Sequence, residues 1–152
     1  MKDRSIIVHG LKDAKAAVVV ASELGVPVTL RSAPGAARYL GATVFRDMIQ
    51  EAQRPHPGVA VTAVFDCGDD PGLALGALRH GLKVIRVSVS GEVLERIADI
   101  AAQSGARLEE DGQDSGGGAC AAGEPVLDLL DMDDPEAAVR SWLTEPGNTK
   151  ER

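Results

Sequence analysis

Aromatic side chains are scarce in this chain of 152 residues, where only 3% of residues are Phe, Trp or Tyr. A core with few aromatic rings has to be filled by Ala, Val, Leu and Ile. Long apolar runs are also missing, since none approaches the ~20 residues that span a bilayer. No charged segment followed by an apolar one opens the chain as a leader would. We therefore expect a cytoplasmic globular protein without a membrane partner.

The chain also lacks a basic stripe, and its formal net charge is -7. Binding the phosphates of a nucleic acid requires clustered Lys and Arg, so we expect no nucleic-acid partner. There are two cysteines, Cys67 and Cys120, which lie far apart without the short spacing of a metal knuckle. We therefore expect reduced thiols and no disulfide framework.

What is present is a regular alternation of short apolar segments with amphipathic helical ones. It predicts an α/β protein of about five parallel strands, built either as a partial (β/α) barrel or as a flavodoxin-like open sheet. We expect one domain over residues 1–145, with a flexible Gly-rich loop at 112–123 and a disordered tail at 146–152. Strands are predicted at 5–9, 27–31, 59–65, 82–88 and 107–109, and helices at 10–24, 36–53, 71–80, 91–104 and from 135 onward.

The segment 59–72 (VAVTAVFDCGDDPG) is a buried strand that runs into a polar turn and a helix start. Asp66, Cys67 and Asp69 lie just beyond its apolar part, at the carboxyl edge where α/β proteins usually build their sites. Asp70 followed by Pro71 is a strong helix start, because the Asp side chain caps free amides and Pro fits the first helical position. Part of the acidity of this turn is therefore structural.

Two interpretations stand for each polar residue at this edge. Asp66 is either a turn carboxylate bonded to local amides or a site residue. Cys67 is a small residue filling the turn, a metal ligand or a reactive thiol, and its acidic neighbours would raise its pKa. His9 reaches the same edge if the sheet is parallel, either as a ligand-binding residue or as a hydrogen-bonded structural one. Ser32 and Gly35 either present amides to an anion or form a turn.

Three segments in the same order resemble class II, zinc-dependent fructose- and tagatose-bisphosphate aldolases. They are PVTLRSAPGAARYLG at 27–41, VAVTAVFDCGDDPGLALGALRHGLKVIRV at 59–87 and DDPEAAVRSWL at 133–143. The resemblance runs from about the first strand to the fifth helix of that family's (β/α)8 barrel of ~250 residues. It implies a barrel-like fold over most of this chain.

The resemblance also implies roles for single residues. Asp66 falls on the family's catalytic aspartate, which exchanges a proton with a substrate hydroxyl. Cys67 falls on its first zinc-binding histidine, and Glu109 or Glu110 lies near an acidic position that flanks the metal. Histidine is thus replaced at position 67, and the strands that would carry the other two zinc histidines and the phosphate loops are not matched. A catalytic zinc needs three protein ligands, so zinc is implied by the resemblance but not expected to bind.

Two functions follow from these residues. We favour a non-catalytic aldolase-like domain that binds a small ligand or a protein partner at the carboxyl edge, through Asp66, His9, Ser32, Gly35 and Asp69. The alternative is a metal-assisted lyase or isomerase acting on a sugar phosphate, with its site completed across a homodimer. In that alternative Cys67 and His9 are metal ligands and Asp66 is the general base.

Overall fold

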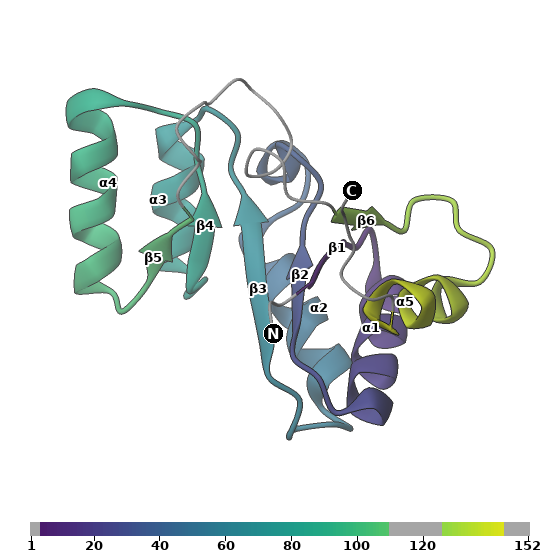
Figure 1. Cartoon of the computed structure of the whole chain (residues 1–152). Coiled ribbons are helices and arrows are strands. Elements are labelled where there is room, and N and C mark those ends of the chain that lie inside the picture. The colour runs from purple at the N-terminus through teal and green to yellow at the C-terminus, as the bar shows by residue number, and fades with distance from the viewer. Residues whose placement is uncertain (1–3, 110–125, 145–152) are drawn as a thin grey trace, which may run out of the picture.

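The computed structural model describes residues 4–109 and 126–144, which form a six-stranded sheet with helices between the strands (Figure 1). All strand pairs are parallel, and the strand order is β5-β4-β3-β2-β1-β6. The predicted α/β class with parallel strands is confirmed, with one strand more than expected. The strands are β1 (Arg4–Ile7), β2 (Val28–Arg31), β3 (Val61–Asp66), β4 (Val84–Arg86), β5 (Arg107–Leu108) and β6 (Val126–Asp128).

The helices begin and end close to the predicted positions, with one exception. They are α1 (Leu11–Leu24), α2 (Ala42–Gln53), α3 (Pro71–Arg79), α4 (Gly91–Gln103) and α5 (Pro135–Thr144). The single helix predicted over 36–53 is wrong, because a short 3-10 turn, η1 (Ala36–Arg38), precedes α2 and an extended Gly41 separates them. Glycine is a poor helix residue, and here the chain turns at it before α2 begins.

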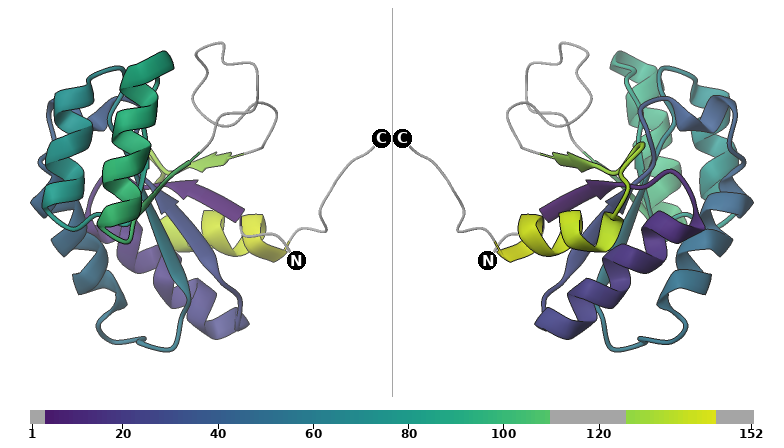
Figure 2. Two further views of the ribbon diagram at one scale, coloured as in Figure 1. Left: turned by 90° about the vertical axis from the view of Figure 1, so that its left-hand side faces the viewer. Right: turned by 90° about the vertical axis from the view of Figure 1, so that its right-hand side faces the viewer.

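All the helices described pack on one face of the sheet. Ile6, Leu30 and Phe65 point from their strands into a single apolar core shared with the helices. The residues that follow or precede them along each strand point to the opposite face, since strand side chains alternate. The two side views in Figure 2 show the helices following one another around the outside of the sheet. This one-sided arrangement agrees with the partial barrel and not with a flavodoxin-like sheet. We call the face without helices the inner face.

The core matches the expectation from composition, with Ala, Val, Leu and Ile as its main components. Two of the few aromatic rings contribute at its centre, where Phe45 of α2 stacks on Phe65 of β3 with ring centroids 5.2 Å apart. Both rings are fully buried. This contact holds α2 against the strand that carries Asp66.

The sixth strand is the part of the fold that the sequence did not predict. The strand at 107–109 was expected to be the last, but β6 follows it in the chain and pairs with β1 at the other end of the sheet. Beyond β6, α5 packs against α1 and buries Val139. The place of β6 beside β1 follows from tertiary pairing between segments far apart in the chain, which local sequence patterns do not indicate.

Several predictions fall outside the described residues. These are the Gly-rich loop at 112–123, the tail at 146–152, and the positions of Glu110 and Cys120. Within the described part of the chain, every helix is too short or too polar to cross a membrane.

Candidate site at the carboxyl edge of the sheet

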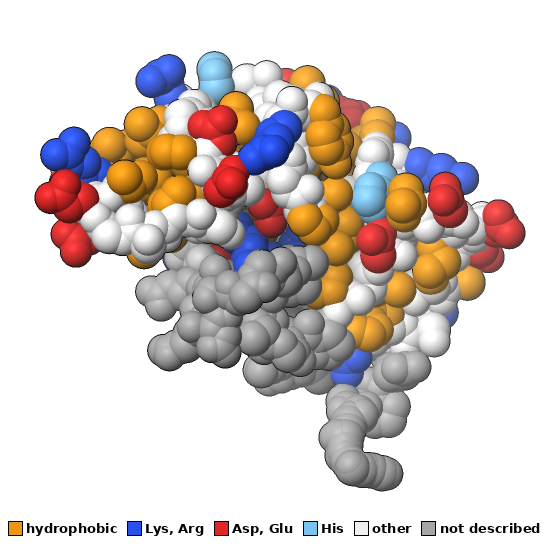
Figure 3. All heavy atoms as spheres, turned by 90° about the horizontal axis from the view of Figure 1, so that it is seen from above, with side chains coloured by type: hydrophobic (Ala, Val, Ile, Leu, Met, Phe, Trp, Pro, Cys, Tyr) orange, Lys and Arg blue, Asp and Glu red, His pale blue; other side chains and the backbone are white. Residues whose placement is uncertain are grey.

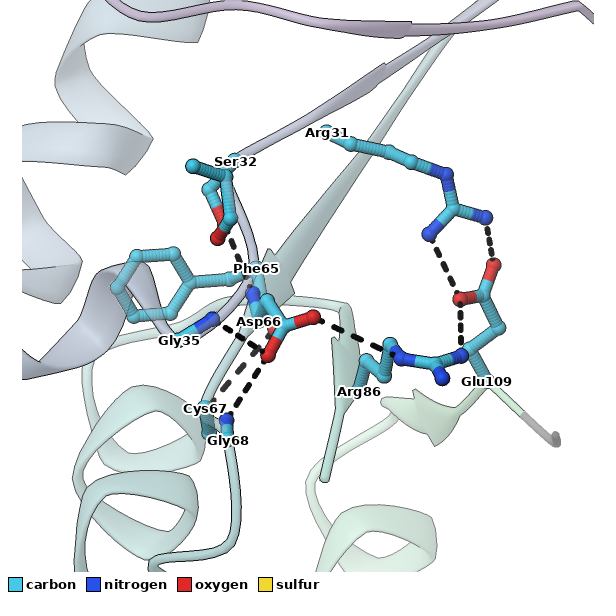
Figure 4. Close-up of polar contacts among 10 residues, drawn as sticks. Arg31, Ser32, Gly35, Phe65, Asp66, Cys67, Gly68, Arg86 and Glu109 are labelled. Carbon is cyan, nitrogen blue, oxygen red and sulfur yellow. Dashed lines mark hydrogen bonds and ion pairs between the residues drawn. The ribbon is translucent and has the colours of Figure 1, made fainter. Parts of the chain in front are cut away.

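Asp66 is the last residue of β3, and its carboxylate joins the turns that follow β2 and β3 (Figure 4). Its Oδ1 accepts hydrogen bonds from the backbone N–H of Gly35 at 3.0 Å and of Gly68 at 2.9 Å. Its own backbone N–H donates to Ser32 Oγ at 2.9 Å. Its Oδ2 lies 3.6 Å from Nε of Arg86, which stands opposite it in the register of β3 and β4. The side chain is therefore engaged on both oxygens.

The two glycines explain why the amides can point at one oxygen. Gly35 and Gly68 have φ values of 68° and 62°, in the left-handed region that side chains other than glycine rarely adopt. A Cβ at position 68 would also come within 3.6 Å of Gly35 Cα, so the two turns lie against each other. The Ser-Ala-Pro-Gly and Cys-Gly segments thus form a matched pair of turns around the carboxylate.

Cys67 points away from Asp66, into the core between the sheet and the helices. Its side chain is completely buried, and its Sγ lies 3.8 Å from the carbonyl oxygen of Phe65. Burial, and then the negative charges of Asp66 and Asp70, raise the pKa of the Cys67 thiol to about 12. The thiol is thus protonated at neutral pH, whereas zinc ligation and nucleophilic attack both require the thiolate.

Four charged side chains form a charge cluster on the inner face: Arg31, Asp66, Arg86 and Glu109. Both guanidinium Nη atoms of Arg31 donate to the carboxylate of Glu109, and the Nη1–Oε1 distance is 2.8 Å. Arg86 Nη1 lies 3.7 Å from Glu109 Oε1, which links this pair to Asp66. The two guanidiniums are 10% and 7% exposed, and the carboxylates of Asp66 and Glu109 are 12% and 18% exposed. Buried charges of both signs are thus paired with one another within this cluster.

The cluster brings together strands that are distant in the sheet. Arg31 ends β2 and Glu109 follows β5, so their contact spans three strand spacings, or about 14 Å on a flat sheet. Figure 4 shows the two side chains extending toward each other over the inner face. Figure 3 looks down on the carboxyl edge of the sheet and shows charged side chains of both signs near the middle of that view.

Sequence reasoning identified Asp66 and Glu109 but missed both arginines. A signal was present, because Arg31 and Arg86 are charged residues at the ends of largely apolar strands. Arg31 lies two residues after Thr29, the other polar residue of β2, so both occupy the same face of the sheet. The alternation thus marks a polar inner face.

The other predicted site residues make separate contacts. His9 Nε2 lies 2.7 Å from Asp128 Oδ1 at the end of β6, and the His9 backbone N–H donates to Asp13 Oδ2 at 2.9 Å. Asp69 pairs with Arg38 at the surface, where both side chains are more than half exposed. His9 and Asp69 thus have charged partners of their own outside the charge cluster.

The described residues do not fit the zinc site that the resemblance implies. Over 4–109 and 126–144, no three His, Cys, Asp or Glu side chains are grouped so that they could hold a metal ion. Cys67, which the resemblance alone matches to that family's first zinc ligand, has its protonated thiol buried in the core.

Comparison with known proteins supports a partial likeness to aldolases. No family model matches the chain. Over 83 residues it is 28% identical to the plasmid-encoded fructose-bisphosphate aldolase of Cupriavidus necator, which covers 55% of this chain and 24% of that protein. A crystal structure of a candidate fructose-1,6-bisphosphate aldolase from Coccidioides immitis superposes with a TM-score of 0.57 at 19% identity.

That superposition covers 70% of this chain and 44% of the fungal one, so the chain spans less than half the length of either protein. The structural similarity, at this level of identity, concerns the fold. Together the two comparisons confirm the resemblance to part of a fructose-bisphosphate aldolase, with an aldolase-related α/β fold.

Proposed function

We propose that this chain is an aldolase-like domain that binds a small ligand at the carboxyl edge of its sheet and does not cleave aldol substrates. The observation that carries the proposal is the position of Asp66, whose Oδ1 accepts from two backbone amides while Oδ2 faces Arg86. A general base must reach the proton of its substrate within hydrogen-bond distance. Here the carboxylate instead joins two turns, which is a structural task.

Arg86 supports the same conclusion. Its guanidinium lies within 4 Å of both Asp66 and Glu109. The positive charge between Asp66 and Glu109 therefore comes from the side chain of Arg86. The neighbouring Cys67, buried and protonated, adds no metal ligand on the inner face.

A coupled assay for triose phosphate released from fructose 1,6-bisphosphate tests the proposal. The purified chain, assayed with added zinc, should give no more product than its Asp66→Asn variant. Asp69→Asn serves as a matched control, since Asp69 is an exposed aspartate of the same turn. Turnover that is present in the wild type and in Asp69→Asn, but lost in Asp66→Asn, would show that Asp66 is catalytic and refute the proposal.

The metal-assisted lyase requires Cys67 and His9 to be ligands of one ion. In the described part of the chain His9 pairs with Asp128 and Cys67 faces the core, so these contacts do not favour it. The homodimer stays a prediction that the mass in solution would test. A dimer carrying stoichiometric zinc that is lost in Cys67→Ala would favour the lyase.

A further inference from the structure

We infer that a second copy of this chain docks on the groove between α1 and α5, with the two copies related by a two-fold axis that runs along the groove. The groove has a volume of about 680 Å³. One of its walls is formed by residues of α1 from Leu11 to Val19, and the other by the segment from Asp133 to Glu136, where α5 begins. The inference goes beyond the proposed function, which concerns the carboxyl edge and the inner face of the sheet.

Large apolar side chains are exposed in the groove and in the segment that leads into it. Leu11, which lines the groove, is 38% exposed. Leu130 and Met132, in the connection from β6 to α5, are 56% and 40% exposed. Apolar side chains that gather at a groove with a polar rim are typical of a protein interaction site.

The two walls of the groove carry opposite charges. The α1 wall has Lys12 and Lys15, and the wall at the start of α5 has Asp133 and Glu136. All four residues are exposed, and within residues 4–109 and 126–144 none of them makes an ion pair. These charges are therefore available to a partner that presents the complementary pattern.

A two-fold axis along the groove makes this face complementary to itself. In a two-fold dimer both copies use the same patch, and each contact between two different residues occurs twice. Rotation about an axis along the groove exchanges its walls, so the lysines of each copy lie opposite the acidic residues of the other. The apolar linings of the two grooves are then buried against each other. A pattern with both signs on one face thus favours a second copy over a partner of uniform charge.

The groove is formed before any partner arrives. Figure 1 shows α5 lying beside α1, and the two helices pack against each other. Val139 of α5 is fully buried, and Arg140 Nη2 donates to Glu23 Oε1 at 2.5 Å. This ion pair links the two helices beyond the groove. Because the walls are already fixed, docking does not have to order them.

The open side of the sheet is a poorer seat for a second copy. The edge strands β5 and β6 have two and three residues, and short edge strands protect a sheet against pairing with another chain. The inner face carries the charge cluster, in which Arg31 pairs with Glu109 within one chain. We therefore expect the two copies to meet on the helical side.

Two complementary charge reversals test the inference by sedimentation velocity over a series of concentrations of the full chain. Lys12→Glu with Lys15→Glu makes both walls negative, and Asp133→Lys with Glu136→Lys makes both walls positive on balance. We expect the wild type to form a dimer, and each double variant alone to have a dissociation constant about a hundredfold higher, because like charges then face each other. An equimolar mixture of the two double variants should form dimers again, since negative walls then meet positive ones.

Control variants separate this effect from net charge and from folding. Arg79→Glu with Arg96→Glu changes the net charge as much as the lysine reversals do, but on exposed positions of α3 and α4, and should leave the dimer unchanged. Asp134 is kept in every variant, because it caps α5 by accepting from the Ala137 amide at 3.1 Å. Far-UV circular dichroism checks that each variant folds. If a reversal does not fold, Lys12→Gln with Lys15→Gln should weaken the dimer in the same direction.

A wild type that stays monomeric at every concentration would overturn the inference and leave the groove to a different partner. A dimer that the folded groove variants leave intact, or that the mixture does not restore, would also overturn it and place the interface elsewhere. These results are independent of aldol cleavage and of ligand binding at the carboxyl edge.

Discussion

Replacing Asp66 with alanine measures how much of this carboxylate's role is structural. The substitution removes the acceptor for two backbone amides, each worth about 1–3 kcal/mol when left without a partner in a buried setting. It also removes a charge beside the buried Arg86, although Glu109 still lies 3.7 Å from that guanidinium. Because the effects overlap, we expect the free energy of unfolding to fall by about 3–5 kcal/mol.

Asparagine at the same position separates the two effects. Its carbonyl oxygen can accept from both Gly35 and Gly68. The amide NH2 group that replaces Oδ2, however, carries no negative charge toward Arg86. We therefore expect a smaller loss for Asp66→Asn, about 1–3 kcal/mol. The exposed Asp69→Ala, which removes only a surface ion pair, should cost less than about 1 kcal/mol.

Chemical denaturation in urea, followed by far-UV circular dichroism, provides the free energies. The expected order of stability is wild type, then Asp69→Ala, then Asp66→Asn, then Asp66→Ala. An Asp66→Ala variant within about 1 kcal/mol of the wild type would refute the reasoning, because two stranded amides cost more than that. It would also mean that the carboxylate of Asp66 is available for chemistry.

Three more predictions concern neighbouring residues. Because the folded pKa of Cys67 is about 12 and its ordinary value is 9.0, its contribution to stability is full below pH 9 and is lost as the pH rises toward 12. The stability of wild type relative to Cys67→Ala should therefore decline over that range, measured by urea unfolding in a Cys120→Ser background. Asp70 caps α3 by accepting from the Gly72 and Leu73 amides, so Asp70→Ala should cost about 1 kcal/mol. Phe65→Ala, which removes the buried ring stacked on Phe45, should cost about 3–5 kcal/mol in the same assay.

Each of these three predictions has its own result that would contradict it. A thiol at position 67 that reacts with an alkylating reagent as fast as free cysteine at pH 8 would contradict the raised pKa of Cys67. Unaltered stability in Asp70→Ala would mean that Pro71 alone defines the start of α3. A loss below about 1.5 kcal/mol in Phe65→Ala would show that the surrounding side chains collapse into the space, against the packing described.

The sequence predicted those parts of the fold that local chemistry determines. Asp70 was expected to start a helix, and its side chain does accept from amides in the first turn of α3. The strand before Asp66 was recognised from its β-branched run. Such features depend on residues within a few positions of one another, so a single sequence suffices to find them.

The charge cluster could be predicted only in part. Glu109 was proposed from a family resemblance, but its partner Arg31 is 78 positions away in the chain. Alternation along β2 and β4 indicates on which face of the sheet each arginine lies. It does not tell which other strand will bring its end close to that arginine. That pairing follows from the order of strands in the sheet, and for β6 the order departs from the order along the chain.

The position of β6 beside β1 also has a consequence for folding. Ser5 pairs with Val126, so the last strand joins segments about 120 residues apart, a contact of high order that forms late and slowly. Pairings such as β2 with β3 close much shorter loops. A nascent chain that emerges from a ribosome would thus assemble β1 to β5 first. One edge of β1 and the surface of α1 would stay uncovered until β6 and α5 are synthesised and pack against them.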